Sequence, residues 1–218
     1  MRRRSGQRRG RPGRHPLGVL LVVPLLAAAG ACTSSSHQSP GRPAASRSTA
    51  EPTPVRGPSS VPWRVRVTHV AGALDGQRER DLVSGVGATI ASYVDDAFLA
   101  GPYPRADFSR AFAGFTTGAA HRAGADQALL TNRPLGSRTR SVRATRRTAY
   151  LSVLAPRGTV AGVTATLDLQ LLVSRTDGTA VRVRLHGRLL LSRDPGRPWT
   201  IFGYDLARSD VPSDGGAP

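Results

Sequence analysis

Three arginines near the C-terminal end of the chain have a spacing that would let them bind an anion together. Arg182, Arg184 and Arg188 alternate with apolar residues, so in a strand they would share one face. A guanidinium group presents a rigid fork of N–H donors that matches carboxylate and phosphate oxygens. A structural explanation stays open, because arginines also simply solvate the outer face of an antiparallel sheet. We expect three further arginines to extend this row into a basic face: Arg143, Arg146 and Arg147.

Cys32 is the only cysteine of the chain and stands at the end of an apolar segment. Residues 1–15 are strongly basic, and residues 16–31 are apolar and end in the small residues Ala29-Gly30-Ala31. This order is typical of a secretory signal peptide, and the apolar run is shorter than the ~20 residues that a membrane-spanning helix needs. The segment therefore predicts export from the cytoplasm.

The small residues followed by a cysteine resemble a bacterial lipoprotein signal, in which the cysteine thiol receives a diacylglycerol before cleavage. The resemblance implies that Cys32 is the lipidation site. Ala29 departs from the pattern, because the family usually has leucine there. Two alternatives stay open: ordinary cleavage after Ala29-x-Ala31, and an uncleaved anchor. A thioether to lipid would also protect a lone thiol from oxidation in an oxidising compartment.

Basic residues outnumber acidic ones by a wide margin. The 218-residue chain has a formal net charge of +17, and all 31 of its basic residues are arginine. Seven arginines precede residue 15; without them, 24 arginines face 14 acids and the net charge is +10. This charge favours attraction to anionic lipid headgroups or cell-wall polyanions, although a GC-rich genome would produce the same arginine bias. An aromatic content of 5% argues against a stacking platform for nucleic acid.

Several kinds of chemistry have no support in the sequence. One cysteine excludes an internal disulfide framework and a cysteine-based zinc cluster. No glycine-rich phosphate loop follows a strand pattern, and no Gly-x-Ser-x-Gly elbow is present. We therefore predict no cofactor and no metal. The histidines considered as metal ligands lack ligand spacing: His37, His69, His121 and His186.

The first half of the folded part predicts one strand and then helices. Residues 63–72 alternate, with Val65, Val67 and His69 expected on one face. Asp75 is expected to cap a long helix over residues 76–99, whose apolar residues recur every three or four positions. Two shorter helical segments are predicted over 106–115 and 117–131.

The second half has a period of two and predicts four long strands. These strands are expected over 140–154, 159–175, 179–193 and 198–207. A change of phase at Arg146-Arg147 indicates a bulge, and Asp177-Gly178 is a strong hairpin signal. Residues from Arg208 onward are expected to form a polar tail.

The predicted fold class is α+β, with N-terminal helices packed in a curved four- to five-stranded antiparallel sheet, a cystatin-like cone. The order of elements over residues 63–209, the hairpin at Asp177-Gly178 and the closing Trp199-x-Ile201 strand resemble the nuclear-transport-factor-2-like superfamily. They are most similar to its Mce-associated and other actinobacterial lipoprotein versions. The predicted segments are a signal peptide (1–31), a disordered tether (32–62), the α+β domain (63–209) and a disordered tail (210–218).

The resemblance also implies an enzymatic alternative. Polyketide cyclases and steroid isomerases of that superfamily use a carboxylate or a His–Asp pair inside the cone. A buried aspartate has a raised pKa and can act as a base, but the Asp95-Asp96 pair could equally lie on the solvated face of the helix. The candidate residues are Asp95, Asp96, Tyr93, Tyr103 and His121.

The sequence favours a lipid-anchored protein on the outer side of the cell membrane with a binding or assembly role in the envelope and no catalysis. Its expected partners are the membrane, through the anchor, and an anionic lipid, a cell-wall polymer or an envelope protein. No nucleic-acid partner is expected. The alternative function is a small isomerase-like or cyclase-like enzyme that acts on a hydrophobic metabolite.

Overall fold

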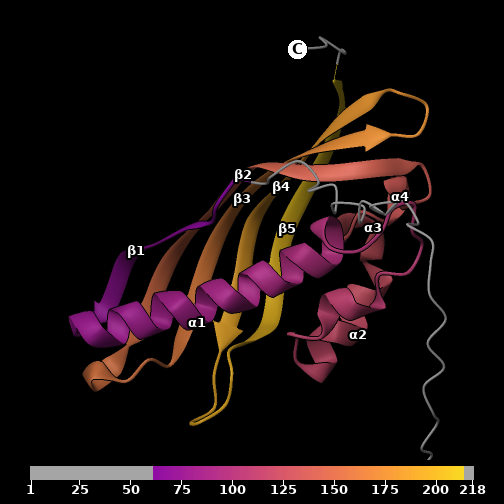
Figure 1. The fold of residues 1–218 in the computed structure, drawn as a ribbon. Coiled ribbons are helices and arrows are strands. Elements are labelled where there is room, and N and C mark those ends of the chain that lie inside the picture. The colour runs from indigo at the N-terminus through magenta and orange to yellow at the C-terminus, as the bar shows by residue number, and fades with distance from the viewer. Residues whose placement is uncertain (1–60, 214–218) are drawn as a thin grey trace, which may run out of the picture. The chain divides into compact units, whose positions relative to one another are not determined.

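One five-stranded sheet carries the fold, and its strands follow the order of the chain. The structure is a computed structural model that describes residues 61–213. The sheet order is β1-β2-β3-β4-β5 (Figure 1). The class is therefore α+β, as predicted. The strands are β1 (Arg64–Gly72), β2 (Thr139–Ala155), β3 (Gly162–Arg175), β4 (Ala180–Ser192) and β5 (Thr200–Ser213).

The sheet is mixed, and the prediction of an antiparallel sheet is wrong for its first strand. β1 pairs with β2 in parallel, whereas the other neighbouring pairs are antiparallel. Parallel neighbours need a long crossover connection, and here all the residues between Gly72 and Thr139, including the longest helix, supply it. The helices therefore follow the first strand and are not N-terminal to the sheet as a whole.

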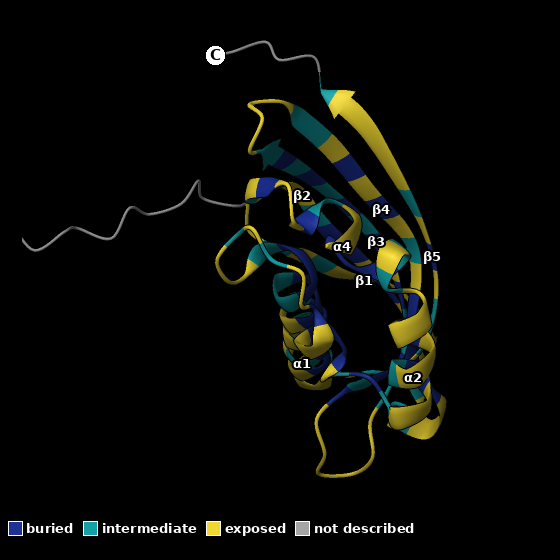
Figure 2. Ribbon diagram, turned by 90° about the vertical axis from the view of Figure 1, so that its right-hand side faces the viewer, coloured by how far each residue is buried: buried dark blue, intermediate teal, exposed yellow. Residues whose placement is uncertain are grey.

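Helix α1 (Gly76–Val94) covers one face of the sheet, as Figures 1 and 2 show. It begins where predicted, because an Asp75 carboxylate oxygen accepts a hydrogen bond from the Arg78 backbone N–H at 2.8 Å. A turn of π-helix, Asp95–Leu99, continues it to the predicted end. Its buried stripe includes Leu82, Val86 and Ile90, which join the core of the sheet.

The remaining helices are shorter than predicted. The segment expected over 106–115 contains only a 3₁₀ turn, Ser109–Phe112, and the segment expected over 117–131 is divided at Asp126. Pro134 does not end the helical region, because proline is tolerated in the first turn of a helix and here stands in a new one. The helices of this region are α2 (Thr117–Ala125), α3 (Gln127–Leu130) and α4 (Arg133–Gly136).

Buried and more exposed residues alternate along β3 and β4, as predicted. Val163, Leu167 and Leu171 of β3 are buried, and Figure 2 shows buried and exposed residues alternating along the strands. The Asp177-Gly178 hairpin joins these two strands, and Gly178 has a φ of 85°, which favours glycine. The apolar side of each strand faces the helical layer.

Two of the register shifts between neighbouring strands decide which side of the sheet the predicted residues face. The pairing of β2 with β3 shifts between Ala144 and Arg146, as the phase change predicted. A second shift lies between Val67 and His69 of β1. The prediction that His69 shares a face with Val65 and Val67 is therefore wrong, and His69 is exposed.

β5 is longer than predicted, because the chain from Arg208 to Ser213 continues the strand. The Arg208 side chain is 7% exposed, pairs with Asp210 at 2.7 Å and donates a hydrogen bond to the Ala128 carbonyl at 3.1 Å. These contacts tie the end of β5 to the carbonyls of α3 and make it part of the sheet. The described residues belong to one compact unit, Pro52–Pro218.

Candidate anion-binding face

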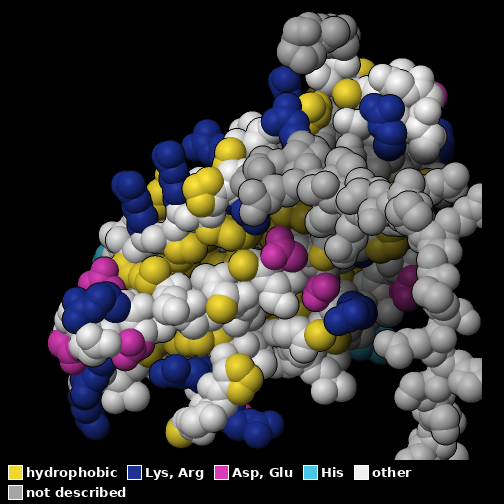
Figure 3. Space-filling model, in the orientation of Figure 1, with side chains coloured by type: hydrophobic (Ala, Val, Ile, Leu, Met, Phe, Trp, Pro, Cys, Tyr) yellow, Lys and Arg dark blue, Asp and Glu magenta, His cyan; other side chains and the backbone are white. Residues whose placement is uncertain are grey.

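The sheet face opposite α1 carries the exposed arginines of the strands, and we call it the outer basic face. Its side chains alternate with the buried ones of β2, β3 and β4. Only two acidic residues, Asp168 and Asp205, lie among its arginines within residues 61–213. In Figure 3, arginine side chains (dark blue) stand along the upper left edge, where Figure 1 places β1. The face is defined by seven exposed arginines: Arg64, Arg66, Arg143, Arg146, Arg182, Arg184 and Arg188.

The predicted row lies on this face, but two of its three charges are paired. Arg184 Nε lies 3.4 Å from Asp168 Oδ1, and Arg188 Nη2 lies 2.6 Å from Asp205 Oδ2. Arg146 Nε contacts the other oxygen of Asp168 at 2.8 Å. The centre of the face therefore keeps an uncompensated positive charge, since the single Asp168 carboxylate is shared by the guanidinium groups of Arg146 and Arg184.

Four arginines of the face have no hydrogen-bond or ion-pair partner for their side chains within the described residues: Arg64, Arg66, Arg143 and Arg182. Arg64 and Arg66 stand two residues apart on β1, in register with Thr148 and Tyr150 of β2. Arg143 and Arg182 flank Leu172 of β3 from the two neighbouring strands. The unpaired charge therefore forms two pairs, one at each end of the face.

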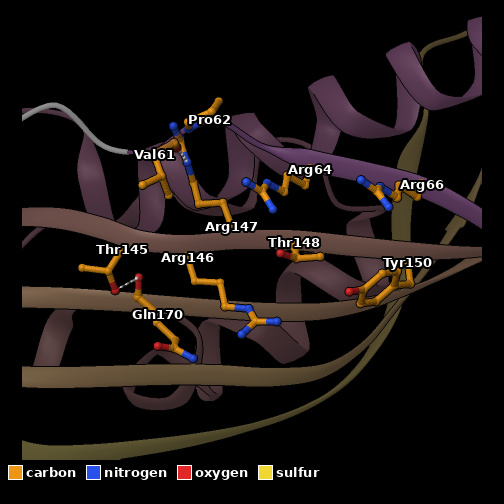
Figure 4. A pocket seen from close by; sticks show the side chains of 10 residues that line it. All are labelled: Val61, Pro62, Arg64, Arg66, Thr145, Arg146, Arg147, Thr148, Tyr150 and Gln170. Carbon is orange, nitrogen blue, oxygen red and sulfur yellow. Dashed lines mark hydrogen bonds between the residues drawn. The ribbon is translucent and has the colours of Figure 1, made fainter.

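The first pair lines a depression of about 570 Å³, which we call the β1 groove (Figure 4). Figure 4 shows Arg64 and Arg66 projecting from β1 on the same side of the sheet as Arg146 and Tyr150. Tyr150 is 40% exposed, so its aromatic ring borders the guanidinium groups of the groove. This arrangement suits an anionic group attached to a larger molecule.

The second pair lines a depression of about 480 Å³, the β4 hollow, with Leu172 between the two arginines. Thr145 and Gln170 line both depressions, so the β1 groove and the β4 hollow are neighbours on one face. Thr145 Oγ1 donates a hydrogen bond to the Gln170 carbonyl at 3.2 Å, which holds this shared wall in place.

Arg147 lines one part of the β1 groove, but its guanidinium does not extend the outer basic face, so this part of the prediction is wrong. The bulge turns its side chain to the inner side, where it is 13% exposed. Arg147 Nε donates to the Val61 carbonyl at 2.6 Å, and its guanidinium lies 5.6 Å from the centre of the Trp63 ring. Arg147 thus holds the start of β1, and it stands beside Val61 in Figure 4.

The residues of the enzymatic alternative do not form a common site. Asp95 is 47% exposed and lies 3.6 Å from Arg147 Nη1. Burial raises the pKa of its carboxyl group, Arg147 opposes that effect, and Asp96 adds to it. Neither carboxylate lines the β1 groove or the β4 hollow.

The other three candidates have separate surroundings. Tyr93 is buried and donates its hydroxyl to the Leu130 carbonyl at 2.8 Å, while Tyr103 donates to the Phe98 carbonyl at 2.6 Å. Burial raises the pKa of both tyrosines. His121 is exposed on α2. Within residues 61–213, no hydrogen bond or ion pair joins any two of the five candidates.

Other predicted features fall elsewhere. Cys32, the signal segment, almost all of the tether and the last five residues lie outside the described residues. His186 is exposed on the outer basic face, and no group of three potential metal ligands occurs in the described part. No helix between residues 61 and 213 combines the length and apolar character needed to cross a membrane.

Sequence reasoning missed Arg64 and Arg66. Their polar-face position in β1 was visible in the alternation, but they lie about 80 residues before β2 and its neighbours. Only the pairing of β1 with β2 brings them to the outer basic face. Comparisons with protein-family models, with curated proteins and with solved structures found no match.

Proposed function

We propose that this protein is a lipid-anchored, extracytoplasmic binding protein of the cell envelope that holds an anionic partner on its outer basic face. One observation carries the proposal: four arginines on one sheet face lack partners of their own within the described residues. Guanidinium groups remain charged at any physiological pH, so they attract carboxylates or phosphates from solution. Each of the two arginine pairs lines a depression of the sheet surface.

The location rests on the sequence. The lipoprotein-like segment ending at Cys32 supports an anchor on the outer side of the membrane, with a tether that would let the domain reach neighbouring envelope components. We also propose a cone-like domain of the nuclear-transport-factor-2-like type, similar to Mce-associated lipoproteins. The long helix against one sheet face supports this, although the parallel β1 differs from the expected topology.

The enzymatic alternative has weaker support. A catalytic carboxylate needs access to a substrate in an enclosed space, and Asp95 is half-exposed and paired with Arg147 instead. The tyrosine hydroxyls nearby are occupied by backbone carbonyls. A binding role, by contrast, uses the four arginines of the outer basic face whose side chains have no partner within the described residues. We therefore prefer it to the enzymatic alternative.

Cell fractionation tests both parts of the proposal. We expect the wild-type chain to sediment with membranes, and Cys32→Ala to lose the mass of the acyl groups and much of its membrane retention. At low salt, part of the Cys32→Ala protein should stay on isolated envelopes through its arginines. Adding four substitutions should remove that part: Arg64→Gln, Arg66→Gln, Arg143→Gln and Arg182→Gln.

A matched control removes the same charge from other exposed arginines, whose side chains make no hydrogen bond or ion pair within residues 61–213. It should leave envelope retention unchanged. Equal retention of the two four-glutamine variants would contradict a role for the outer basic face. Full membrane retention of Cys32→Ala would contradict the lipid anchor. The control substitutions are Arg110→Gln, Arg138→Gln, Arg157→Gln and Arg197→Gln.

A further inference from the structure

The β1 groove and the β4 hollow are neighbouring depressions of the outer basic face, and we call the two together the trough. They share Thr145 and Gln170, and each holds one pair of unpartnered arginines. Between the pairs, Arg146 and Arg184 share the Asp168 carboxylate, which compensates part of their charge. The trough therefore has an unpartnered pair of cations at each end and a less positive, polar middle.

The spacing of the two ends excludes a small anion as a ligand for both. About two strand spacings and about five residues along a strand separate them, so the pairs lie roughly 15–20 Å apart. A single phosphate or carboxylate can contact only one end. A molecule with anionic groups repeated along its length can contact both, and two-point attachment raises its apparent affinity without any new kind of contact.

We propose that the trough binds a linear polymer of repeated phosphate groups, with phosphates at the Arg64–Arg66 pair and at the Arg143–Arg182 pair. This inference rests on the proposed binding function and names its ligand class. A phosphate offers each guanidinium two oxygens in the geometry of its fork. The middle, where Asp168 compensates part of the charge, attracts phosphate less strongly than the two ends do.

Two other phosphate-rich ligands fit the trough less well. A lipid bilayer presents a continuous anionic plane, which would meet the Asp168 and Asp205 carboxylates as well as the arginines. Single-stranded nucleic acid needs aromatic side chains on which its bases stack. Among residues 61–213, Tyr150 is the only aromatic residue that lines the two depressions. A polymer without bases matches what the trough offers.

Tryptophan fluorescence of the complete chain in an uncharged detergent gives a local readout. The two tryptophans are Trp63 and Trp199, and Trp63 lies next to the groove residue Arg64, so a polymer bound in the groove is expected to change its emission. We expect saturable binding of linear inorganic polyphosphate, and binding of orthophosphate at least about tenfold weaker at equal phosphate concentration.

Each arginine pair is then removed separately. Arg64→Gln/Arg66→Gln and Arg143→Gln/Arg182→Gln should each weaken polyphosphate binding roughly tenfold and lower the slope of log K against log salt by about two. Their unfolding midpoints should not change, since all four side chains are exposed and unpartnered. The control Arg110→Gln/Arg197→Gln removes the same charge elsewhere and should bind as the wild type does.

Four results would overturn the inference. Orthophosphate binding as tight as polyphosphate binding would indicate a single-anion site, and loss of binding in only one double variant would exclude the trough. Tighter binding of polyglutamate would show that the face does not select phosphate. Preference for phosphatidylglycerol vesicles or for an RNA oligonucleotide would assign the face to a membrane or to nucleic acid. If polyphosphate fails while envelope retention still depends on the four arginines, the proposed function stands without this ligand.

Discussion

Arg147 and Asp95 form a contact between β2 and the end of the long helix, on the inner side of the sheet. The Arg147 guanidinium is largely shielded from solvent, because it donates a hydrogen bond to the Val61 carbonyl and packs near Trp63. Asp95 is held where burial raises the pKa of its carboxyl group. An arginine that looked like part of the binding surface is therefore structural, whereas its neighbour Arg146 remains on the outer basic face.

Asp95→Asn should change how stability depends on pH. Because the folded-state pKa is raised, the wild-type carboxyl contributes stability that is fully present below its unfolded pKa and is lost as the pH rises through the folded pKa. Near about pH 7, we expect Asp95→Asn to be more stable, by less than about 1 kcal/mol, because solvent screens this half-exposed group. The difference should shrink as the pH approaches about 4.

Urea unfolding of both proteins over this pH range measures the effect, with Asp194→Asn, at an exposed aspartate between β4 and β5, as the control. A wild-type protein that is more stable than Asp95→Asn at neutral pH would show that the pair with Arg147 outweighs the cost of burial. In that case Asp95 would stabilise the folded protein through Arg147, which also holds the start of β1.

At the scale of elements, α1 packs closely against Trp199, which precedes β5, because Gly85 of the helix has no side chain. A Cβ atom at Gly85 would lie 2.8 Å from Cδ1 of Trp199, which is closer than real Cβ contacts. The two glycines in the middle of α1 weaken the helix, but they have different surroundings. At Gly87, an added Cβ would lie 3.4 Å from Cγ2 of Val65, an ordinary contact.

Gly85→Ala and Gly87→Ala should therefore change stability in opposite directions. We expect Gly85→Ala to destabilise the protein by about 1–2 kcal/mol, because the buried indole or the helix must move. Gly87→Ala should stabilise it by about 0.5–1 kcal/mol through helix propensity. Urea midpoints measure both changes. Stabilisation by Gly85→Ala would show that Trp199 can move without cost and that the close packing at this point is not important.

At the scale of the whole molecule, the buried apolar residues of the described part form one core. Buried side chains of α1, β2, β3, β4 and β5 join one hydrophobic cluster, to which the apolar residues of β1 are added as partly buried members. The compact unit that contains them is Pro52–Pro218. Folding of this unit should therefore not need the export segment.

A chain of residues 52–218 is expected to unfold in one cooperative transition, within about 1 kcal/mol of the free energy of unfolding of the complete chain. Circular dichroism during urea unfolding, compared with the complete chain, measures this. A start at Ala73, which removes β1 and its partly buried valines, serves as the negative control and should lose cooperativity. Loss of cooperative unfolding in the 52–218 chain itself would show that earlier residues contribute to the core.

The sequence alone determined the features that depend on neighbouring residues. The period of two in β3 and β4, the period of the long helix, the cap at Asp75, the bulge before Arg146 and the hairpin at Gly178 are all local patterns. They placed Arg182, Arg184 and Arg188 on a polar face. Local periodicity works here because each residue's direction follows from the backbone geometry of its own element.

Only the tertiary structure decided which elements meet. A strand's alternation is the same whether its neighbour is parallel or antiparallel, so the sequence of β1 could not reveal its parallel pairing with β2 or the arrival of Arg64 and Arg66 beside Tyr150. The bulge turned Arg147 inward, and Asp168 paired with Arg184 from another strand. These outcomes depend on contacts between segments far apart in the chain, which no short window of sequence contains.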